Sequence, residues 1–264
     1  MPETKVAIIG GTGVYKQNFL ENEQDLSVDT KFGSVTIKQG EHKKRKVFFM
    51  ARHGGGHTVP PHLVNYKANL AALKKLEVDA VIATAAVGAL NQNMPPGCRV
   101  IIDQFIDFTS HRSLTFYEGK EGYVVHTDFS EPYCPEVRSA IIKAGAKLDQ
   151  HLVDGGCYLC CEGPRFETPA EIKMFRQWGA DLVGMTNLPE VVLAREAGLC
   201  YATIALPTNY AAGVSKKPLT HQEVLEAMDR DETSLNQLLA CCIEEINTEH
   251  ACSCREAGKN WPKE

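Results

Sequence analysis

The sequence predicts an α/β fold in which helices cover both faces of a mixed, mostly parallel β-sheet, giving three layers. Short β-rich apolar runs alternate along the chain with amphipathic helical segments, which is the pattern of strands joined by crossover helices. The 264 residues, 44% apolar and 23% charged, are enough to bury one large core. Since no repeat or linker interrupts this pattern, we expect a single domain over residues 1–264, with a polar C-terminal tail at 249–264.

The first half of the chain contains most of the predicted strands. Apolar runs bounded by glycine or polar residues predict strands at 5–9, 34–38, 46–50, 80–84 and 99–103. A helix is expected at 64–76, where Leu70, Ala71 and Leu73 recur with helical spacing. A loop rich in Gly, Pro and Asn at 88–97 separates the last two of these strands.

The second half of the chain alternates strands with helices. Strands are expected at 158–161, 182–184 and 201–206, and helices at 135–148, 189–197 and 220–246. A further helix begins after Thr168, because Thr168, Pro169 and Glu171 have the spacing of a capping box with proline at the first helical position. The loop at 105–132 is long for a compact domain, so we expect it to be functional or to pack on a partner.

Charge and the lengths of apolar runs exclude several classes of protein. Lys and Arg total 28 against 33 Asp and Glu, and neither sign forms a long block, so the basic surface that nucleic acids require is missing. The longest nearly uncharged apolar stretch, 80–90, is far shorter than the ~20 residues of a membrane span. The apolar run at 5–9 meets a Gly-Gly turn before it could form the core of a signal peptide. We therefore expect a cytoplasmic enzyme.

The ten cysteines are spread through segments whose sequence is typical of a core, so we expect most of them to be reduced and structural. Cys157 and Cys160 have the spacing of a redox or zinc motif, but no second such pair follows. Cys252 and Cys254 lie in the polar tail, where a local disulfide is an open alternative. No metal site is predicted.

Polar or glycine residues follow six of the predicted strands. Gly10-Gly11-Thr12-Gly13 could bind an anion through its backbone amides and the Thr12 hydroxyl, although a plain turn explains it equally well. Arg52 and His53 begin a glycine-rich loop, and a guanidinium beside an imidazole suits an oxyanion such as phosphate, with a charged surface loop as the alternative. The other strand ends are 84–88, 162–168, 185–190 and 207–211. We expect all six to meet at one rim of the sheet, where open α/β sheets bind ligands.

These segments resemble, in order, those of the trimeric purine nucleoside phosphorylase and methylthioadenosine phosphorylase family, from about residue 5 to residue 246. They are Gly10-Gly11-Thr12-Gly13, Ala51-Arg52-His53, Val64-Asn65-Tyr66, Asp103-Gln104-Phe105-Ile106-Asp107, Glu162-Gly163-Pro164-Arg165-Phe166 and Met185-Thr186 with Pro189-Glu190-Val191-Val192-Leu193-Ala194. The framework is most similar to the methylthioadenosine branch. The resemblance implies a three-layer phosphorylase-type fold and phosphorolysis, in which inorganic phosphate displaces a purine from C1′ of a ribonucleoside without cofactor or metal.

The resemblance also implies where the substrates bind. Phosphate would contact Thr12, Arg52, His53, Ala85, Ala86 and Thr186. Ala86 would offer its backbone N–H, whereas Ala85 stands where the methylthioadenosine branch has a hydroxyl residue. The nucleoside would contact Phe166, Glu167, Met185, Asn209, Ala211 and His221. In these positions Phe166 would flank the purine, Met185 would pack on the ribose and His221 would face the 5′-hydroxyl.

Two side chains are expected to select the base and to assist its departure. Glu167, when ionised, only accepts hydrogen bonds and therefore complements the N1–H of a 6-oxopurine. Asn209 can donate to N7 and stabilise the charge that develops on the leaving purine. The methylthioadenosine branch has Ser and Asp at these positions, whereas the pair in this chain is that of the 6-oxopurine phosphorylases. An adenine would leave Glu167 unpaired at a cost of ~1–3 kcal/mol, so we predict inosine and guanosine as substrates.

Alternatives to this function are kept open. 5′-Methylthioinosine or 5′-methylthioadenosine phosphorolysis is the first, and His221 favours unmodified nucleosides over it. A non-catalytic nucleoside-binding protein is less well supported, and a dinucleotide oxidoreductase would depend on Gly10–Gly13 alone. The resemblance further implies a homotrimer, or a dimer of trimers, with a residue such as His126 of the 105–132 loop completing a neighbouring site.

Overall fold

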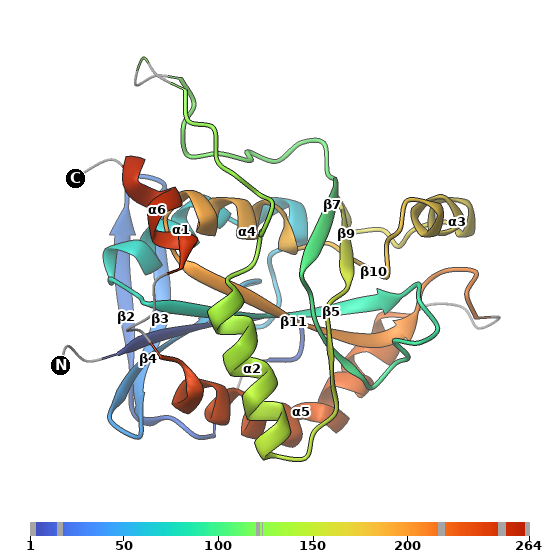
Figure 1. Cartoon of the computed structure of the whole chain (residues 1–264), viewed down its shortest axis with the longest axis horizontal. Coiled ribbons are helices and arrows are strands. Elements are labelled where there is room, and N and C mark those ends of the chain that lie inside the picture. The colour runs from blue at the N-terminus through green and yellow to red at the C-terminus, as the bar shows by residue number, and fades with distance from the viewer. Residues whose placement is uncertain are drawn as a thin grey trace.

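A mixed β-sheet forms the centre of the molecule (Figure 1). The computed structural model describes residues 4–14, 18–119, 122, 124–215, 220–247 and 252–261. Its strands are β1 (Lys5–Gly10), β2 (Glu21–Thr30), β3 (Gly33–His42), β4 (Arg45–Ala51), β5 (Ala80–Ala89), β6 (Arg99–Ile101), β7 (Gln104–Phe108), β8 (Leu152–Asp154), β9 (Cys157–Cys161), β10 (Leu182–Gly184) and β11 (Cys200–Tyr210). The order is β2-β3-β4-β1-β5-β10-β9-β7, with β11 also paired to β5, β6 paired to β11, and β8 paired to β6.

Parallel pairing dominates this sheet, as the sequence predicts. β1 is parallel to β4 and β5, and β11 is parallel to β5. The pairs β9–β10, β7–β9 and β6–β8 are also parallel. The antiparallel pairs are β2–β3, β3–β4, β6–β11 and β5–β10. The expectation that all strand ends meet at one rim is wrong, because β9 and β10 run opposite to β5 and reach the site from the other direction.

Helices cover both faces of the sheet, which confirms the predicted α/β class. The helices are α1 (Tyr66–Lys75), α2 (Pro135–Lys147), α3 (Pro169–Gln177), α4 (Asn187–Glu196), α5 (His221–Glu245) and α6 (Ser253–Ala257), with short 3-10 turns at Pro61–Leu63 and Gly258–Asn260. α1 and α4 contribute to one buried cluster with Leu70 and Val191, and α2 and α5 to another with Ile141 and Leu238 (Figure 1). Among the described helices, none combines the length and apolarity that a bilayer span requires.

Several elements differ from the sequence prediction. β2 is mostly exposed and polar, with Val28 as its one buried residue, so no apolar pattern marks it; it is held by its pairing with β3. β5 extends to Ala89 into the expected loop at 88–97, and the strand expected at 99–103 ends at Ile101. The three-residue strand β8 was also not predicted. Short or polar strands depend on their partners more than on their own sequence.

The loop expected at 105–132 begins with β7 and then arches away from the sheet (Figure 1). Phe116 and Tyr117 are buried within the same chain, where the ring of Phe116 packs edge-on against Trp261 at 4.7 Å. Phe108 packs against Phe175 and Trp178 at the β7 end. Phe108, Phe116 and Tyr117 therefore find partners inside the chain. Tyr123, the other aromatic residue of this loop for which we expect burial, lies outside the described residues.

The capping box predicted at Thr168 is present and fixes the start of α3. Thr168 Oγ1 accepts a hydrogen bond from the Glu171 backbone N–H at 3.2 Å, and a Glu171 carboxylate oxygen accepts one from the Thr168 N–H at 2.7 Å. Arg165 donates to the same carboxylate and to the Phe166 carbonyl. The segment that contains Phe166 and Glu167 is thereby tied to the first turn of the helix.

Replacing Thr168 by Ala should lower the free energy of unfolding by about 1 kcal/mol, because one backbone N–H of the first turn loses its acceptor. Urea denaturation followed by circular dichroism measures this change. Thr168→Ser, which keeps the hydroxyl, is the matched control and should stay close to the wild type. Equal stability of Thr168→Ala and the wild type would contradict the capping role.

Candidate active site

A cavity of about 350 Å³ lies beside the second half of β5. It brings together every predicted site residue whose side chain the structure describes: Thr12, Arg52, His53, Ala85, Ala86, Phe166, Glu167, Met185, Thr186, Asn209 and Ala211. The side chain of His221, at the first position of α5, lies outside the described part of the chain. His126 is exposed and is not among the residues that line the cavity.

The cavity exists because one edge of β5 lacks a strand partner along part of its length. β11 pairs with β5 from Ala80 to Ala89 and so occupies one edge throughout. β1 pairs with the other edge only as far as Ala83, and β10 only from Gly88. No described strand pairs with this edge at residues 84–87, so buried backbone groups there are open to other partners.

Thr84 marks the beginning of this gap, and residues from the first and fourth strands bind it. Gly11 donates its backbone N–H to Thr84 Oγ1 at 2.9 Å, and Arg52 Nη1 donates to the Thr84 carbonyl at 2.9 Å. A Cβ on Gly11 would lie 2.6 Å from the Thr84 carbonyl oxygen, so glycine is required for this approach. Because backbone groups two residues apart point to the same edge of a strand, Ala86 presents its N–H to the gap.

Arg52 forms a buried ion pair that the sequence does not predict. Its Nε and Nη2 each donate to a carboxylate oxygen of Glu190 at 2.6 Å, and both side chains are almost fully buried. Burial lowers the pKa of Arg52, but the charge and hydrogen bonds of Glu190 outweigh it, so the pKa is raised and the guanidinium is charged. Nε and Nη2 each use one N–H on Glu190, and Nη1 uses one N–H on the Thr84 carbonyl. Only the N–H groups of Arg52 that these contacts do not use are available to a ligand in the cavity.

A chain of hydrogen bonds continues from Glu190 into the core. Tyr201 donates its hydroxyl to Glu190 Oε1 at 2.8 Å and accepts from Thr203 Oγ1 at 3.0 Å. Asn187 Nδ2 donates to Thr203 Oγ1 at 3.0 Å, and Tyr133 donates to the Asn187 side-chain oxygen. Such a satisfied buried network holds its members in one arrangement, so the position of Arg52 is fixed from behind.

His53 is neutral in this site. Its Nδ1 lies 2.8 Å from the Val59 carbonyl oxygen, which only accepts, so Nδ1 carries the proton and Nε2 is an acceptor. Burial, followed by the charge of Arg52, lowers the pKa of His53 to about 4. The neighbouring His57 ring lies 4.3 Å away, centroid to centroid, and also lines the cavity. His57, Thr58 and Pro60 were not predicted as lining residues, since only the fold of the glycine-rich loop turns them inward.

Glu167 is the least satisfied polar group of the cavity. Its side chain is almost fully buried, at 8% exposure, and its Oε1 has no hydrogen-bond partner among the described residues. Burial raises the pKa of Glu167, and hydrogen bonds from its own backbone and from the Cys161 side chain offset only part of this effect. The adjacent Phe166 ring is 39% exposed and also lines the cavity. The carboxylate is therefore placed to accept from a ligand.

A β-bulge places Asn209 in the cavity. The register between β11 and β5 shifts after Pro207, so that Asn209 pairs with Gly88 and Thr208 is the extra residue. Bulges of this kind redirect a side chain and are common beside active sites. Asn209 Oδ1 accepts from Thr208 Oγ1 at 3.0 Å, and its Nδ2 donates to the Tyr210 carbonyl at 2.9 Å. The second Nδ2 hydrogen is available to a ligand.

Met185 and Thr186 enter the cavity from the end of β10. Gly163 has φ +66°, and a Cβ there would lie 2.6 Å from the Met185 sulfur, so glycine lets the two segments approach. Thr186 is the N-cap of α4, but its side chain makes no capping hydrogen bond. Leu188, two residues further on, has the non-helical angles φ −105° and ψ 132°, so the regular turns of α4 begin only after Leu188.

The comparisons with known proteins identify the family. The model of the phosphorylase superfamily matches residues 5–244. The chain belongs to the phosphorylase superfamily. It is 52% identical over 257 residues to a probable 6-oxopurine nucleoside phosphorylase of Dictyoglomus turgidum, with 97% of each chain covered. It is 49% identical over 260 residues to the 6-oxopurine nucleoside phosphorylase of Pyrococcus furiosus, covering 97% of this chain and 98% of the relative.

A solved structure shows that the likeness extends to the whole phosphorylase fold. The methylthioadenosine phosphorylase of Schistosoma mansoni, in complex with adenine, superposes with a TM-score of 0.91 at 33% sequence identity. The comparison covers 97% of this chain and 96% of that one. The resemblance inferred from the sequence motifs is thus confirmed at the level of family and fold, with relatives in both branches.

Replacing Glu190 by Ala should lower the free energy of unfolding by about 3–5 kcal/mol, because the buried Arg52 charge would lose its partner. Urea denaturation measures this loss. The matched control is Glu245→Ala, which removes an ion pair with the exposed Lys147 and should cost less than about 1 kcal/mol. Similar effects of the two substitutions would show that the buried pair has no special weight.

His53 should make stability depend on pH in a defined interval. Its pKa is about 4 in the folded protein against 6.5 for the unperturbed side chain, so the unfolded chain takes up a proton first as the pH falls. This contribution, roughly 3 kcal/mol, is complete above pH 6.5 and is lost as the pH falls to about 4. Urea denaturation of the wild type and His53→Asn at several pH values measures it.

The His53→Asn variant should show a shallower loss of stability over this interval. Asn can still donate to the Val59 carbonyl but does not titrate. The exposed His151, replaced by Asn, is the control and should leave the pH dependence unchanged. Parallel pH profiles for wild type and His53→Asn would refute the assignment of a neutral, buried imidazole.

Proposed function

We propose that this protein cleaves the N-glycosidic bond of 6-oxopurine ribonucleosides with inorganic phosphate, giving the free base and ribose 1-phosphate. The observation that carries the proposal is the buried carboxylate oxygen of Glu167, which has no hydrogen-bond partner among the described residues. A buried acceptor without a donor is costly, by about 1–3 kcal/mol or more for a charged group. A ligand that brings a donor to this position removes that cost.

The edge of the purine decides which ligand fits. A 6-oxopurine presents N1–H, a donor, whereas a 6-aminopurine presents N1 as an acceptor. Glu167 would therefore pair with hypoxanthine or guanine and would face a lone pair of adenine. The half-exposed Phe166 ring, tied to the start of α3, would flank the base, and Met185 and Ala211 would contact the nucleoside.

Phosphate would bind at the gap in β5. The donors available there are the Ala86 backbone N–H, the hydroxyls of Thr12 and Thr186, and the N–H groups of Arg52 that Glu190 and Thr84 do not use. His53 is neutral, and its Nε2 would accept the hydrogen of a monohydrogen phosphate. Ala85 supplies no side-chain donor, so this chain would make one phosphate or ribose contact fewer than the methylthioadenosine branch.

The reaction follows from these two half-sites. A phosphate oxygen forms a bond to C1′ while the bond from C1′ to N9 breaks, and the electron pair of that bond moves into the purine. Asn209 Nδ2 would donate to N7 and Glu167 would hold N1–H, so negative charge on the base is stabilised as it develops. The proton of hydrogen phosphate balances the one that the free base acquires. No cofactor or metal takes part, since phosphate is the second substrate.

A 5′-methylthio nucleoside is the second candidate substrate. The apolar side chain of Val224 lines the cavity from the first turns of α5, the segment expected to meet the 5′ end. Such a contact suits a methylthio group as well as it suits an unmodified ribose. Glu167 would require a 6-oxopurine whether the ribose is unmodified or carries a 5′-methylthio group. Among methylthio nucleosides, Glu167 therefore favours 5′-methylthioinosine over 5′-methylthioadenosine.

We also propose that the protein is a homotrimer in which the loop that follows β7 completes a neighbouring site. This loop arches away from the body of the chain (Figure 1). Leu114 and Val124 on this loop are exposed. His126 is exposed on the same loop. An exposed, projecting loop with apolar side chains is typical of a segment that packs on a partner.

Initial rates of phosphorolysis test the proposal. With saturating phosphate, kcat/KM for inosine and guanosine should exceed that for adenosine by about 5- to 150-fold, which corresponds to about 1–3 kcal/mol. Glu167→Gln should lower kcat/KM for inosine by a similar factor while reducing the preference against adenosine, since the amide can donate to N1. The same assay with 5′-methylthioinosine compares the two candidate substrates.

The control for the substitution is Glu77→Gln, which changes an exposed glutamate outside the cavity and outside the 105–132 loop, and it should leave all rates unchanged. Turnover of adenosine equal to that of inosine in the wild type would contradict base selection by Glu167. An absence of any phosphate-dependent base release would contradict the function as a whole.

A further inference from the structure

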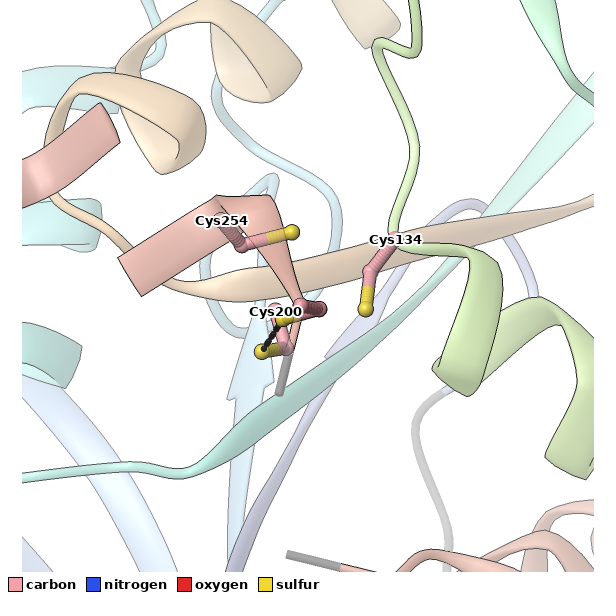
Figure 2. A group of neighbouring side chains, drawn as sticks. Cys134, Cys200 and Cys254 are labelled. Atoms are coloured by element: carbon pink, nitrogen blue, oxygen red, sulfur yellow. Dashed lines mark hydrogen bonds between the residues drawn. The ribbon is translucent and has the colours of Figure 1, made fainter. Parts of the chain in front are cut away.

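Four cysteines from three separate parts of the chain come together at one point (Figure 2). Cys134 precedes α2, Cys200 begins β11, and Cys252 and Cys254 lie at the start of α6. Their Sγ atoms all lie within 4.8 Å of one another. Cys134, Cys200 and Cys254 are each 1% exposed, and Cys252 is half-buried. Within the expected polar C-terminal tail at 249–264, the described residues 252–261 include α6 and the buried Cys254.

We propose that these four cysteines bind one Zn²⁺ ion as a structural site. Tetrahedral zinc holds four thiolates at about 2.3 Å, which places every pair of sulfurs about 3.8 Å apart. A set in which all pairs already lie within 4.8 Å needs only small side-chain movements to reach that geometry. All ten cysteines lie in the described part of the chain, and none forms a disulfide there; the sulfurs of Cys200 and Cys252 are 3.3 Å apart.

Two of the four proposed ligands, Cys134 and Cys200, are held next to each other by backbone contacts that do not involve the C-terminal segment. Cys134 donates its N–H to the Tyr201 carbonyl at 2.8 Å, which holds the start of α2 beside the start of β11. Cys134 and Cys200 are thus presented together by the body of the protein. The Cys252-Ser253-Cys254 segment then supplies the other two sulfurs. Preformed ligands of this kind reduce the entropy that metal binding costs.

A buried arginine beside the cluster supports the negative charge that zinc binding creates. Arg195, on α4, is 4% exposed and donates to Cys254 Sγ at 3.2 Å and to Ser253 Oγ at 3.1 Å. No described carboxylate forms an ion pair with Arg195, and its Nε has no hydrogen-bond partner among the described residues. The exposed Asp128 interacts with the Arg195 charge only at longer range. A buried cation needs an anion.

The charge balance of the proposed site meets this need. Four thiols release four protons to solvent when they bind Zn²⁺, which leaves a complex with a net charge of −2. The guanidinium of Arg195 neutralises part of that charge and donates a hydrogen bond to a ligand sulfur, as outer groups of metal sites do. If all four thiols were protonated, Arg195 would have no anion in contact, and a thiolate-bound Zn²⁺ would supply that negative charge.

The ion would fasten the C-terminal segment onto the rest of the chain. Gly258, just after α6, packs against Gly198, and Trp261 packs against Phe116 of the loop that follows β7. None of the four cysteines lines the candidate active site. The role is structural, and it does not depend on the proposed phosphorolysis.

Metal analysis of the full-length protein tests this proposal. Protein purified under anaerobic, reducing conditions should contain about one zinc per chain by inductively coupled plasma mass spectrometry. The double variant Cys252→Ser and Cys254→Ser should lose this zinc, whereas Cys98→Ser and Cys241→Ser, at cysteines outside the cluster, should keep it. Should the double variant fold poorly, Cys252→Ser alone, at a half-buried position, should weaken zinc retention during chelator dialysis.

Thermal unfolding and cobalt substitution add independent readouts. A strong chelator should lower the Tm of the wild type by several degrees and leave the double variant unchanged. Co²⁺ added to the chelated wild type should give the visible absorption of a tetrahedral thiolate site. Four reactive thiols with no bound metal would overturn the proposal, and so would an intact mass lowered by two hydrogens for each disulfide formed within the cluster. Rates of phosphorolysis play no part in these measurements.

Discussion

The site depends on an interruption in strand pairing along one edge of β5. β1 pairs with that edge as far as Ala83 and β10 only from Gly88, while β11 holds the opposite edge throughout. Continuous pairing would satisfy the backbone groups between these points and fill the space that the cavity occupies. Gly11 and Arg52 satisfy Thr84 at the start of the interruption, and the groups that follow are left to a ligand.

Two charged or polar side chains of the cavity, Arg52 and His53, already interact with other groups of the protein. Glu190 neutralises Arg52, and burial together with Arg52 keeps His53 uncharged. An anion in this site would therefore meet directed N–H and O–H donors more than an excess of positive charge. Such donors orient an anion without a strong attraction from net positive charge. In the proposed reaction this would allow phosphate to be released as ribose 1-phosphate after each turnover.

Much of the fold is readable in the sequence because its apolar strands and amphipathic helices follow local periodicity. β1, β4, β10 and the capped α3 were located from their own residues, whereas the polar β2 was missed because its pairing with β3, and not its composition, makes it a strand. The residues of the cavity could be named from motifs at strand ends. Their meeting point was wrongly expected at one rim, since the direction of β9 and β10 relative to β5 is not encoded locally.

The sequence by itself determined which chemical groups are available to the proposed site: a carboxylate, a carboxamide, an arginine, a histidine and threonines. Only the tertiary structure decided that Arg52 is paired with Glu190, 138 residues away, that Glu167 is buried without a partner among the described residues, and that four cysteines meet at Cys134. The physical reason is that these contacts depend on strand order, register and helix packing, which join residues far apart in the chain and leave no local pattern.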